Sequence, residues 1–444
     1  MSFALFVVYL LMMFVRPAEH FVELRDVPFM QIASILALVG GALAILMGSR
    51  PPLRAGQVSL IFLIIVWMTW SVLVTGSGSE AFDKVLGFIK SPLTAFLLVI
   101  LNVTTVRRVR VVALVLTIPA VFLAIRTASD YQTHLEEVAR SHRGDLETEG
   151  ADSTWDNPSE QTGEPVPKFA PDDNFRVMNK GLFGDPNDLA LTLIAILPFT
   201  LALRRKAAPI RNVLLVWIPV AVIVYGVYVT RSRGGVLALA CVLGLLVRHK
   251  LGNSMSLATA GIAVVGLLGA GFVGSRSMSM DQSAEGRIEM WSAGLQNLKG
   301  SPLWGIGFSN FDPVNSKAAH SAYVQCFAEL GLVGYVLWLG LLLVTLDDLR
   351  GIHASAQPED ADLRHWSRAV QVSLIGFLIG AIFLSRAYDV QMFILIGLGT
   401  AMGDVARRRG YLKVGRSILT WIYICGGAAI GSIVGYWLYM RLHF

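Results

Sequence analysis

Long apolar runs separated by short polar breaks make up most of the chain. Each run has the composition of a buried or membrane-spanning helix, and the runs lie near residues 3–15, 28–48, 57–75, 85–102, 111–127, 186–203, 210–230, 234–247, 255–274, 320–346, 369–385, 389–404 and 417–438. A helix needs about 20 apolar residues to cross the hydrocarbon core of a bilayer. Irregular backbone facing lipid would leave polar groups unsatisfied. The pattern therefore predicts an all-α fold, a polytopic transmembrane helical bundle of about 12–13 helices.

Three of the runs, 3–15, 234–247 and 389–404, are too short to cross the bilayer alone. A run of about 14 residues reaches only about 21 Å, against a core of about 30 Å. The second of these helices should therefore start below the outer surface, which places Arg231 and Arg233 in a recess. Arginine at membrane depth usually faces a water-filled cavity or a partner, and the alternative is snorkelling to the headgroups. Both interpretations stay open for Arg231, whereas the two glycines after Arg233 favour a buried anion ligand.

Two long polar segments interrupt the apolar pattern and divide the chain into five regions. The expected regions are N-terminal transmembrane helices (1–127), an acidic segment (128–184), central transmembrane helices (185–274), an outer loop with short amphipathic helices (275–319) and C-terminal transmembrane helices (320–444). The acidic segment holds twelve Asp/Glu against five Lys/Arg, together with four Pro. Such a composition buries too little apolar surface to fold alone, so we expect the segment to be partly disordered, with its middle part, from about Arg140 to Pro171, disordered or loosely packed.

The distribution of charge predicts how the bundle is oriented. Only 15% of the residues are charged and the net charge is +6, whereas soluble domains carry about 25% charged residues. If the N-terminus is cytoplasmic, the cytoplasmic breaks hold nineteen Lys/Arg, and the short outer breaks with the C-terminal tail hold eight. Lys and Arg accumulate in cytoplasmic loops, so both long polar segments should lie outside the cytoplasm. Because the cations lie between apolar segments, we expect the lipid bilayer, and no nucleic acid, as a partner.

In this orientation Arg233, Arg287 and Arg386 converge on the outer side of the membrane. A guanidinium group binds phosphate in a bidentate fork and is preferred over Lys where geometry matters. Arg287 lies on a segment whose apolar residues recur at helical spacing: Ile288, Trp291, Leu295 and Leu298. We expect this helix to lie flat on the membrane surface with Trp291 at the interface. Alone, this pattern favours a plain interfacial helix with Arg287 on lipid headgroups.

A single histidine, His320, directly precedes a long apolar helix and follows a Gly/Pro-rich loop over 300–307. A neutral imidazole at that position can take a proton from an attacking hydroxyl. A lone histidine at a membrane interface is more often only a hydrogen-bonding residue. The chain contains no Ser-His-Asp pattern, Gly-x-Ser-x-Gly, His-Glu-x-x-His or P-loop, which argues against hydrolase, metalloprotease and NTPase functions.

No metal or cofactor site is expected. Asp360 and Asp362 form an Asp-x-Asp pair, which can hold a divalent metal on a nucleotide sugar. Such pairs are common by chance, and this one lies on the opposite side of the membrane from the other polar features. We therefore favour a solvated loop there. The three cysteines fall in apolar runs without metal or redox spacing.

Several motifs over residues 184–335 resemble the O-antigen ligase and O-antigen polymerase superfamily of bacterial membrane glycosyltransferases. They are Gly184-Asp185-Pro186-Asn187-Asp188-Leu189-Ala190, Thr230-Arg231-Ser232-Arg233-Gly234-Gly235, Arg287-x-x-x-Trp291, Pro302-Leu303-x-Gly305-x-Gly307, His320-Ser321-x-Tyr323 and Glu329-x-Gly331-x-x-Gly334. The family's usual His-Asn stands here as His320-Ser321, and the acidic segment is atypical.

The resemblance implies a metal-independent, inverting glycosyltransferase without a cofactor, in the bacterial inner membrane with its active site in the periplasmic loop region. Its donor would be a glycan on undecaprenyl diphosphate. By position, Arg233 and Arg287 would bind the diphosphate and His320 would activate the acceptor hydroxyl. Arg386 and Arg231 are further candidate cations. Supporting roles are expected for Asn187, Asp188, Tyr323, Glu329 and Asp389, although helix capping explains Asn187 and Asp188 equally well.

The sequence leaves the acceptor open. A ligase would move a finished polysaccharide onto lipid A–core or a similar acceptor, and a polymerase would move it onto another lipid-linked repeat unit. A transporter or flippase for a lipid-linked sugar would also need a positive cavity. It would place that cavity at mid-membrane and show repeat symmetry, and no repeat is evident.

Overall fold

The computed structural model describes residues 2–15, 29–48, 55–76, 78–151, 185–248, 277–412 and 417–443. These residues form helices joined by turns, with no strand among them. The helices are α1 (Ser2–Val15), α3 (Phe29–Leu46), α4 (Gly56–Thr75), α5 (Gly78–Phe88), α6 (Thr94–Asn102), α7 (Val106–Ala151), α8 (Pro186–Ala202), α9 (Pro209–Asn212), α10 (Ile218–Val229), a helix over 233–248, α12 (Ser277–Gly300), α13 (Phe311–Asn315), α14 (Ala322–Ser355), α15 (Ala361–Gly380), α16 (Val390–Arg408) and α17 (Ile418–His443). Two π-helical segments, η2 (Ile89–Leu93) and η3 (Val213–Trp217), join α5 to α6 and α9 to α10, and two short 3-10 turns, η5 (Pro358–Asp360) and η6 (Ala381–Phe383), flank α15.

The predicted all-α polytopic bundle is confirmed. Within the described ranges, nine helical segments are long and apolar enough to cross a membrane, judged by length and composition. The helix predicted at 255–274 lies outside the described residues. The chain is thus a multi-pass membrane protein.

Two helices, α8 and α16, lie at the centre of the bundle. Nearly every residue of α8 and α16 is buried, and α8 packs along α15 while α16 packs between α6, α14 and α15. A helix enclosed by protein needs no polar face and need not match the bilayer thickness. The prediction that 389–404 is too short to span is corrected, because α16 continues to Arg408 and reaches spanning length.

The helix α7 continues well past residue 127, where its apolar run ends, and reaches Ala151. The helix thus includes residues 140–151, at the start of the part that was expected to be disordered or loosely packed. An ion pair between Glu136 and Arg140, one helical turn apart, joins their side chains at 3.5 Å. Glu, Leu and Arg are good helix formers even where they bury nothing. The remainder of the acidic segment, 152–184, lies outside the described residues.

The long helix α14 is broken at Gly331, where φ is 65° and ψ is −170°. The loop over 301–307 enters the break and supplies the hydrogen bonds that the helix loses. The bonds run from Ile306 N to Ala328 O (2.9 Å), from Gly307 N to Glu329 O (3.0 Å) and from Leu332 N to Pro302 O (2.8 Å). Only glycine fits, because an added Cβ would lie 2.3 Å from the carbonyl oxygen of Leu303. Irregular backbone is tolerated at membrane depth when protein satisfies it in this way.

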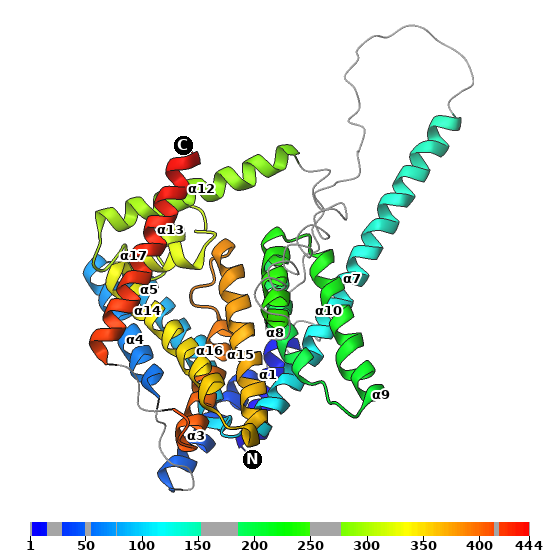
Figure 1. Cartoon of the computed structure of the whole chain (residues 1–444). Coiled ribbons are helices and arrows are strands. Elements are labelled where there is room, and N and C mark those ends of the chain that lie inside the picture. Colours follow the sequence, from blue (N-terminus) through cyan, green and yellow to red (C-terminus); the bar gives the residue numbers. More distant parts are fainter. Residues whose placement is uncertain are drawn as a thin grey trace.

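Four helices begin at the same end of the bundle: α8, the helix over 233–248, α14 and α16. We call this the site end. Figure 1 shows α12 crossing the bundle near the C-terminus, with the N-terminus toward the opposite side. The turns that precede these four helices come from distant parts of the sequence, so the fold gathers the polar motifs into one region.

Candidate functional site

The helices of the site end begin with side-chain caps. Asp185 accepts a hydrogen bond from Asn187 N (2.9 Å) at the start of α8, and Asp389 accepts one from Gln391 N (2.8 Å) at the start of α16. At α14 the cap is Ser321 rather than His320. The Asn187 side chain also donates to Asp185 (2.9 Å), so it completes the cap of α8. Because helix N-termini carry partial positive charge, their convergence favours an anion at this end.

Phe383, at the end of η6, joins two of the predicted arginine segments. A Cβ added to Gly234 would lie 3.2 Å from its ring, and the guanidinium carbon of Arg287 lies 5.9 Å from the centroid of the same ring. The segment of Arg233 and the helix of Arg287 therefore meet across one aromatic side chain. Arg233 itself is exposed, which corrects the expectation of a buried ligand. Close packing of Gly234 and Gly235 draws the backbone inward, and the arginine side chain is left at the surface.

His320 is exposed at the site end and has a left-handed backbone, with φ at 50°. Such a conformation is uncommon outside glycine and often marks functional sites. Partial desolvation and the positive charge of Arg287 lower the pKa of the imidazole, and the carboxylates of Asp185 and Asp312 act in the opposite direction without cancelling them. The imidazole is therefore neutral at neutral pH and able to accept a proton.

Arg386 and Asp188 form a two-pronged ion pair. The Nε atom of Arg386 donates to one carboxylate oxygen (2.6 Å) and Nη2 donates to the other. The Asp188 side chain is 7% exposed and that of Arg386 is 37% exposed. The guanidinium fork that was expected to hold phosphate is thus already occupied by the carboxylate of Asp188.

Arg231 lies among tyrosines at the end of α10. Its Nη2 atom donates to the hydroxyl of Tyr131 (3.0 Å), and its guanidinium carbon lies 5.6 Å from the ring centroid of Tyr228. Its backbone is also left-handed, with φ at 53°. The residue connects α7 to α10 and borders the turn that carries Arg233.

Tyr323 and Glu329 hold the site together from within. The hydroxyl of Tyr323 donates to the carbonyl of Leu378 on α15 (3.1 Å). Glu329 is 1% exposed, and its Oε1 atom accepts from the backbone N–H of Phe311 (3.3 Å). Tyr323 therefore ties the start of α14 to α15, and Glu329 ties α14 to the start of α13.

Carboxylates at the opposite end are engaged in structural contacts. Asp360 accepts hydrogen bonds from Arg409 and from the Tyr411 hydroxyl (2.5 Å), and Asp362 accepts one from Arg110 (2.9 Å). Across the described ranges, no three His, Cys, Asp or Glu side chains gather as metal ligands would.

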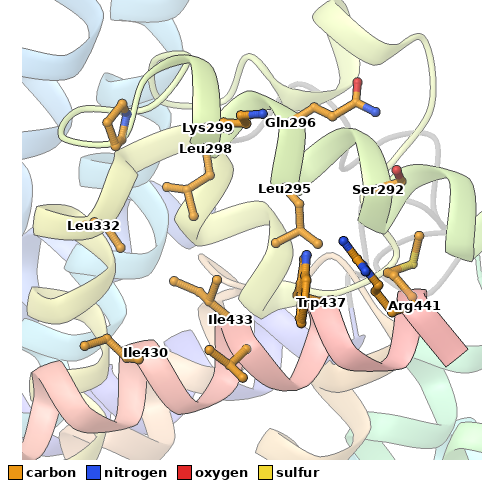
Figure 2. A pocket seen from close by; sticks show the side chains of 13 residues that line it. Ser292, Leu295, Gln296, Leu298, Lys299, Leu332, Ile430, Ile433, Trp437 and Arg441 are labelled. Atoms are coloured by element: carbon orange, nitrogen blue, oxygen red, sulfur yellow. The ribbon is translucent and has the colours of Figure 1, made fainter.

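A groove of about 990 Å³ lies between α12 and α17, which are in contact beside it. Figure 2 shows its apolar lining and the cationic side chains of Lys299 and Arg441, one from each helix. The helix predicted around Arg287 is present as α12. Trp291, however, is 7% exposed and packs on the ring of Tyr436 at 5.0 Å instead of lying at the lipid interface.

Taken together, the fold and the site define a multi-pass α-helical membrane protein with arginines and a neutral histidine gathered at one end. Residues 218–339 match the family model of O-antigen ligase, which confirms the resemblance to the O-antigen ligase and polymerase superfamily. The matched range contains Arg231, Arg233, Arg287 and His320, and it excludes Arg386. No curated protein matches the chain. The family match supports a glycosyltransferase activity of the O-antigen ligase or polymerase type.

Proposed function

We propose that this protein is a metal-independent, inverting glycosyltransferase that moves a glycan from undecaprenyl diphosphate to an acceptor hydroxyl at the periplasmic face of the inner membrane. The proposed acceptor is lipid A–core or a similar molecule, as in an O-antigen ligase. The observation that carries the proposal is the meeting of the Arg233 segment and Arg287 across Phe383, close enough to His320 for Arg287 to lower its pKa.

In this proposal the arginines act on the leaving group. The bond between the anomeric carbon and the diphosphate breaks, and negative charge grows on the departing oxygen. Arg233 and Arg287 stabilise that charge without a metal, because charge-assisted hydrogen bonds are strong where water is partly excluded. The convergent helix N-termini add to the same field.

His320 acts on the other substrate. Its neutral imidazole accepts the proton of the acceptor hydroxyl as the oxygen forms its bond to the anomeric carbon. Attack comes from the face opposite the diphosphate, so the configuration at that carbon is inverted. The products are the glycosylated acceptor and free undecaprenyl diphosphate.

Purified protein, incubated with a lipid-linked glycan and candidate acceptors, tests the proposal. We expect transfer without nucleotide and in the presence of a chelator. Transfer to lipid A–core identifies a ligase, and transfer to a second lipid-linked repeat unit identifies the alternative, a polymerase. A strict requirement for a divalent cation would contradict the mechanism, and movement of the lipid across a vesicle bilayer without transfer would indicate a flippase.

A further inference from the structure

A second cavity of about 300 Å³ lies beside the Arg386–Asp188 ion pair. Its wall comes from α1, α3, η2, the first turns of α14 and the turn before α16. The polar or aromatic side chains that matter here are Tyr9, Gln325, Ser385, Arg386, Tyr388 and Asp389. Gln325 lies in the first turns of the helix that follows His320, so the cavity adjoins the proposed transfer site.

Three polar atoms of the cavity wall are buried without a partner. The Oε1 atom of Gln325, the Oγ atom of Ser385 and the hydroxyl oxygen of Tyr388 are shielded from solvent, and none of them has a hydrogen-bond partner within the part of the chain that the structure describes. Buried polar atoms are nearly always satisfied, because an unmade hydrogen bond is costly. All three atoms belong to side chains that line the same cavity. A ligand that carries hydroxyl groups would satisfy them.

The charges of the wall argue against an anionic ligand. The guanidinium of Arg386 is paired with Asp188. The carboxylate of Asp389 also lines the cavity, where it caps α16. Because Asp188 compensates the charge of Arg386, and Asp389 adds a negative charge, the wall offers no net positive charge to a diphosphate. A carboxylate and an amide oxygen instead accept hydrogen bonds from neutral hydroxyl groups.

The volume and the remaining wall fit a single ring. Ligand pockets run from about 300 to 1,000 Å³, so this one lies at the small end. Tyr388 is held rigidly in the wall, because its ring packs on Phe308 at 4.9 Å and on Phe88 at 6.3 Å. Pockets of this kind combine apolar or aromatic walls with a few placed polar groups.

We propose that this cavity is a sugar subsite that binds one uncharged sugar ring of a substrate glycan through Gln325, Ser385 and Asp389. The inference rests on the proposed function for the identity of the glycan. It separates two tasks at the site end: the arginines of the transfer site hold the diphosphate, and the subsite holds neutral sugar. The ring belongs either to the glycan of the donor or to the acceptor, and the test distinguishes the two.

The test measures binding and transfer for Gln325→Leu and Ser385→Ala. Protein in lipid nanodiscs is titrated with the lipid-linked glycan and with bare undecaprenyl diphosphate, and the KM for the acceptor is measured separately. Each variant loses one hydrogen bond, so we expect about three- to tenfold weaker binding of glycan-bearing donor, or a similar rise in acceptor KM. Affinity for bare undecaprenyl diphosphate should stay unchanged, which also shows that the variants are folded.

Ser373→Ala is the matched control. Its hydroxyl is likewise buried without a partner among the described residues, but it does not line the cavity, so no effect is expected. Loss of affinity for donor glycan assigns the ring to the donor, and a raised acceptor KM assigns it to the acceptor. The subsite is refuted if both quantities stay at the wild-type value, or if bare undecaprenyl diphosphate weakens equally. Because donor binding is measured without turnover, it is independent of whether transfer occurs.

Discussion

The two ends of the bundle hold their arginines in different ways. At the end opposite the site end, four arginines are ion-paired with aspartates: Arg110 with Asp362, Arg407 with Asp348, Arg408 with Asp404 and Arg409 with Asp360. At the site end, Arg231 and Arg287 lie against aromatic rings, and Arg233 has no ion pair among the described residues. An aromatic ring contacts the flat face of a guanidinium group, whereas the N–H donors of the guanidinium group point outward in its own plane. The aromatic rings therefore help to orient the guanidinium groups of Arg231 and Arg287 at the site end.

Arg386 is the exception within the site end. Its pairing with Asp188 resembles the arrangement at the opposite end. The comparison therefore divides the four candidate cations by what they contact rather than by where they lie. Arg233 and Arg287 fit substrate binding, and Arg386 fits a structural role beside the sugar subsite.

The largest expected effect comes from His320, the proposed general base. His320→Ala should reduce transfer by about 10²–10⁴, the usual contribution of a general base. Donor binding should remain near the wild-type value, because His320 contacts only the acceptor in the proposed mechanism. Single-turnover transfer and donor affinity, measured on the same purified variant, separate these quantities. Lost donor binding with normal turnover at saturating donor would make His320 a diphosphate ligand instead.

The next prediction tests the comparison directly. Arg233→Ala and Arg287→Ala should each weaken donor binding by about ten- to a hundredfold, the value of a charge-assisted hydrogen bond. Lys at either position should restore little, since it lacks the planar fork. Arg409→Ala, at the opposite end, is the control and should leave donor affinity unchanged. Equal losses at both ends would show that overall charge, and not the site, governs binding.

A smaller effect, on stability, is expected from the ion pair at the site end. Asp188→Ala removes the two-pronged partner of Arg386 and should lower the free energy of unfolding by about 1–3 kcal/mol, less than for a fully buried pair because Arg386 is partly exposed. The double variant Asp188→Ala with Arg386→Met should recover part of the loss. Thermal unfolding in detergent measures it, with Arg233→Ala as the variant expected to unfold like wild type. A stable Asp188→Ala protein that has lost donor binding would return Arg386 to the diphosphate site.

Some features of the fold could be predicted from the sequence and others could not. The helices were predictable, because lipid demands long apolar segments and α-helical backbone. The extension of α7 to Ala151 was not predictable, because charged residues such as Glu and Arg are compatible with a helix as well as with a disordered segment. The break at Gly331 was hidden, since the apolar pattern continues through it. The sequence feature that marks the break is the pair of glycine motifs at 305–307 and 331–334, whose segments are joined by backbone hydrogen bonds in the structure.

For the site, the sequence pointed to residue types but not to their partners. Arg233, Arg287 and His320 were candidates by position, yet Phe383 is an ordinary apolar residue at a helix end and carries no pattern. The pairing of Arg386 with Asp188 joins residues far apart in the chain. The local sequence around an arginine does not show whether its partner in the fold will be a carboxylate or an aromatic ring. That distinction arises only from tertiary packing.

The smallest and most specific effect concerns pH. A general base must be unprotonated, so transfer should fall as pH decreases through the pKa of His320. That pKa is lowered by partial desolvation and by Arg287, which places the acid limb of the profile below the ordinary histidine value of about 6.5. Arg287→Gln removes a positive charge that disfavours the imidazolium, so the limb should move to higher pH. Asp312→Asn removes a negative charge that favours it, so the limb should move to lower pH. Single-turnover rates at saturating donor, measured across pH, isolate this effect from donor binding. Opposite shifts in the two variants, with no shift in Arg409→Gln, would tie the profile to the local field at His320, whereas shifts in the same direction would show that another group controls the limb.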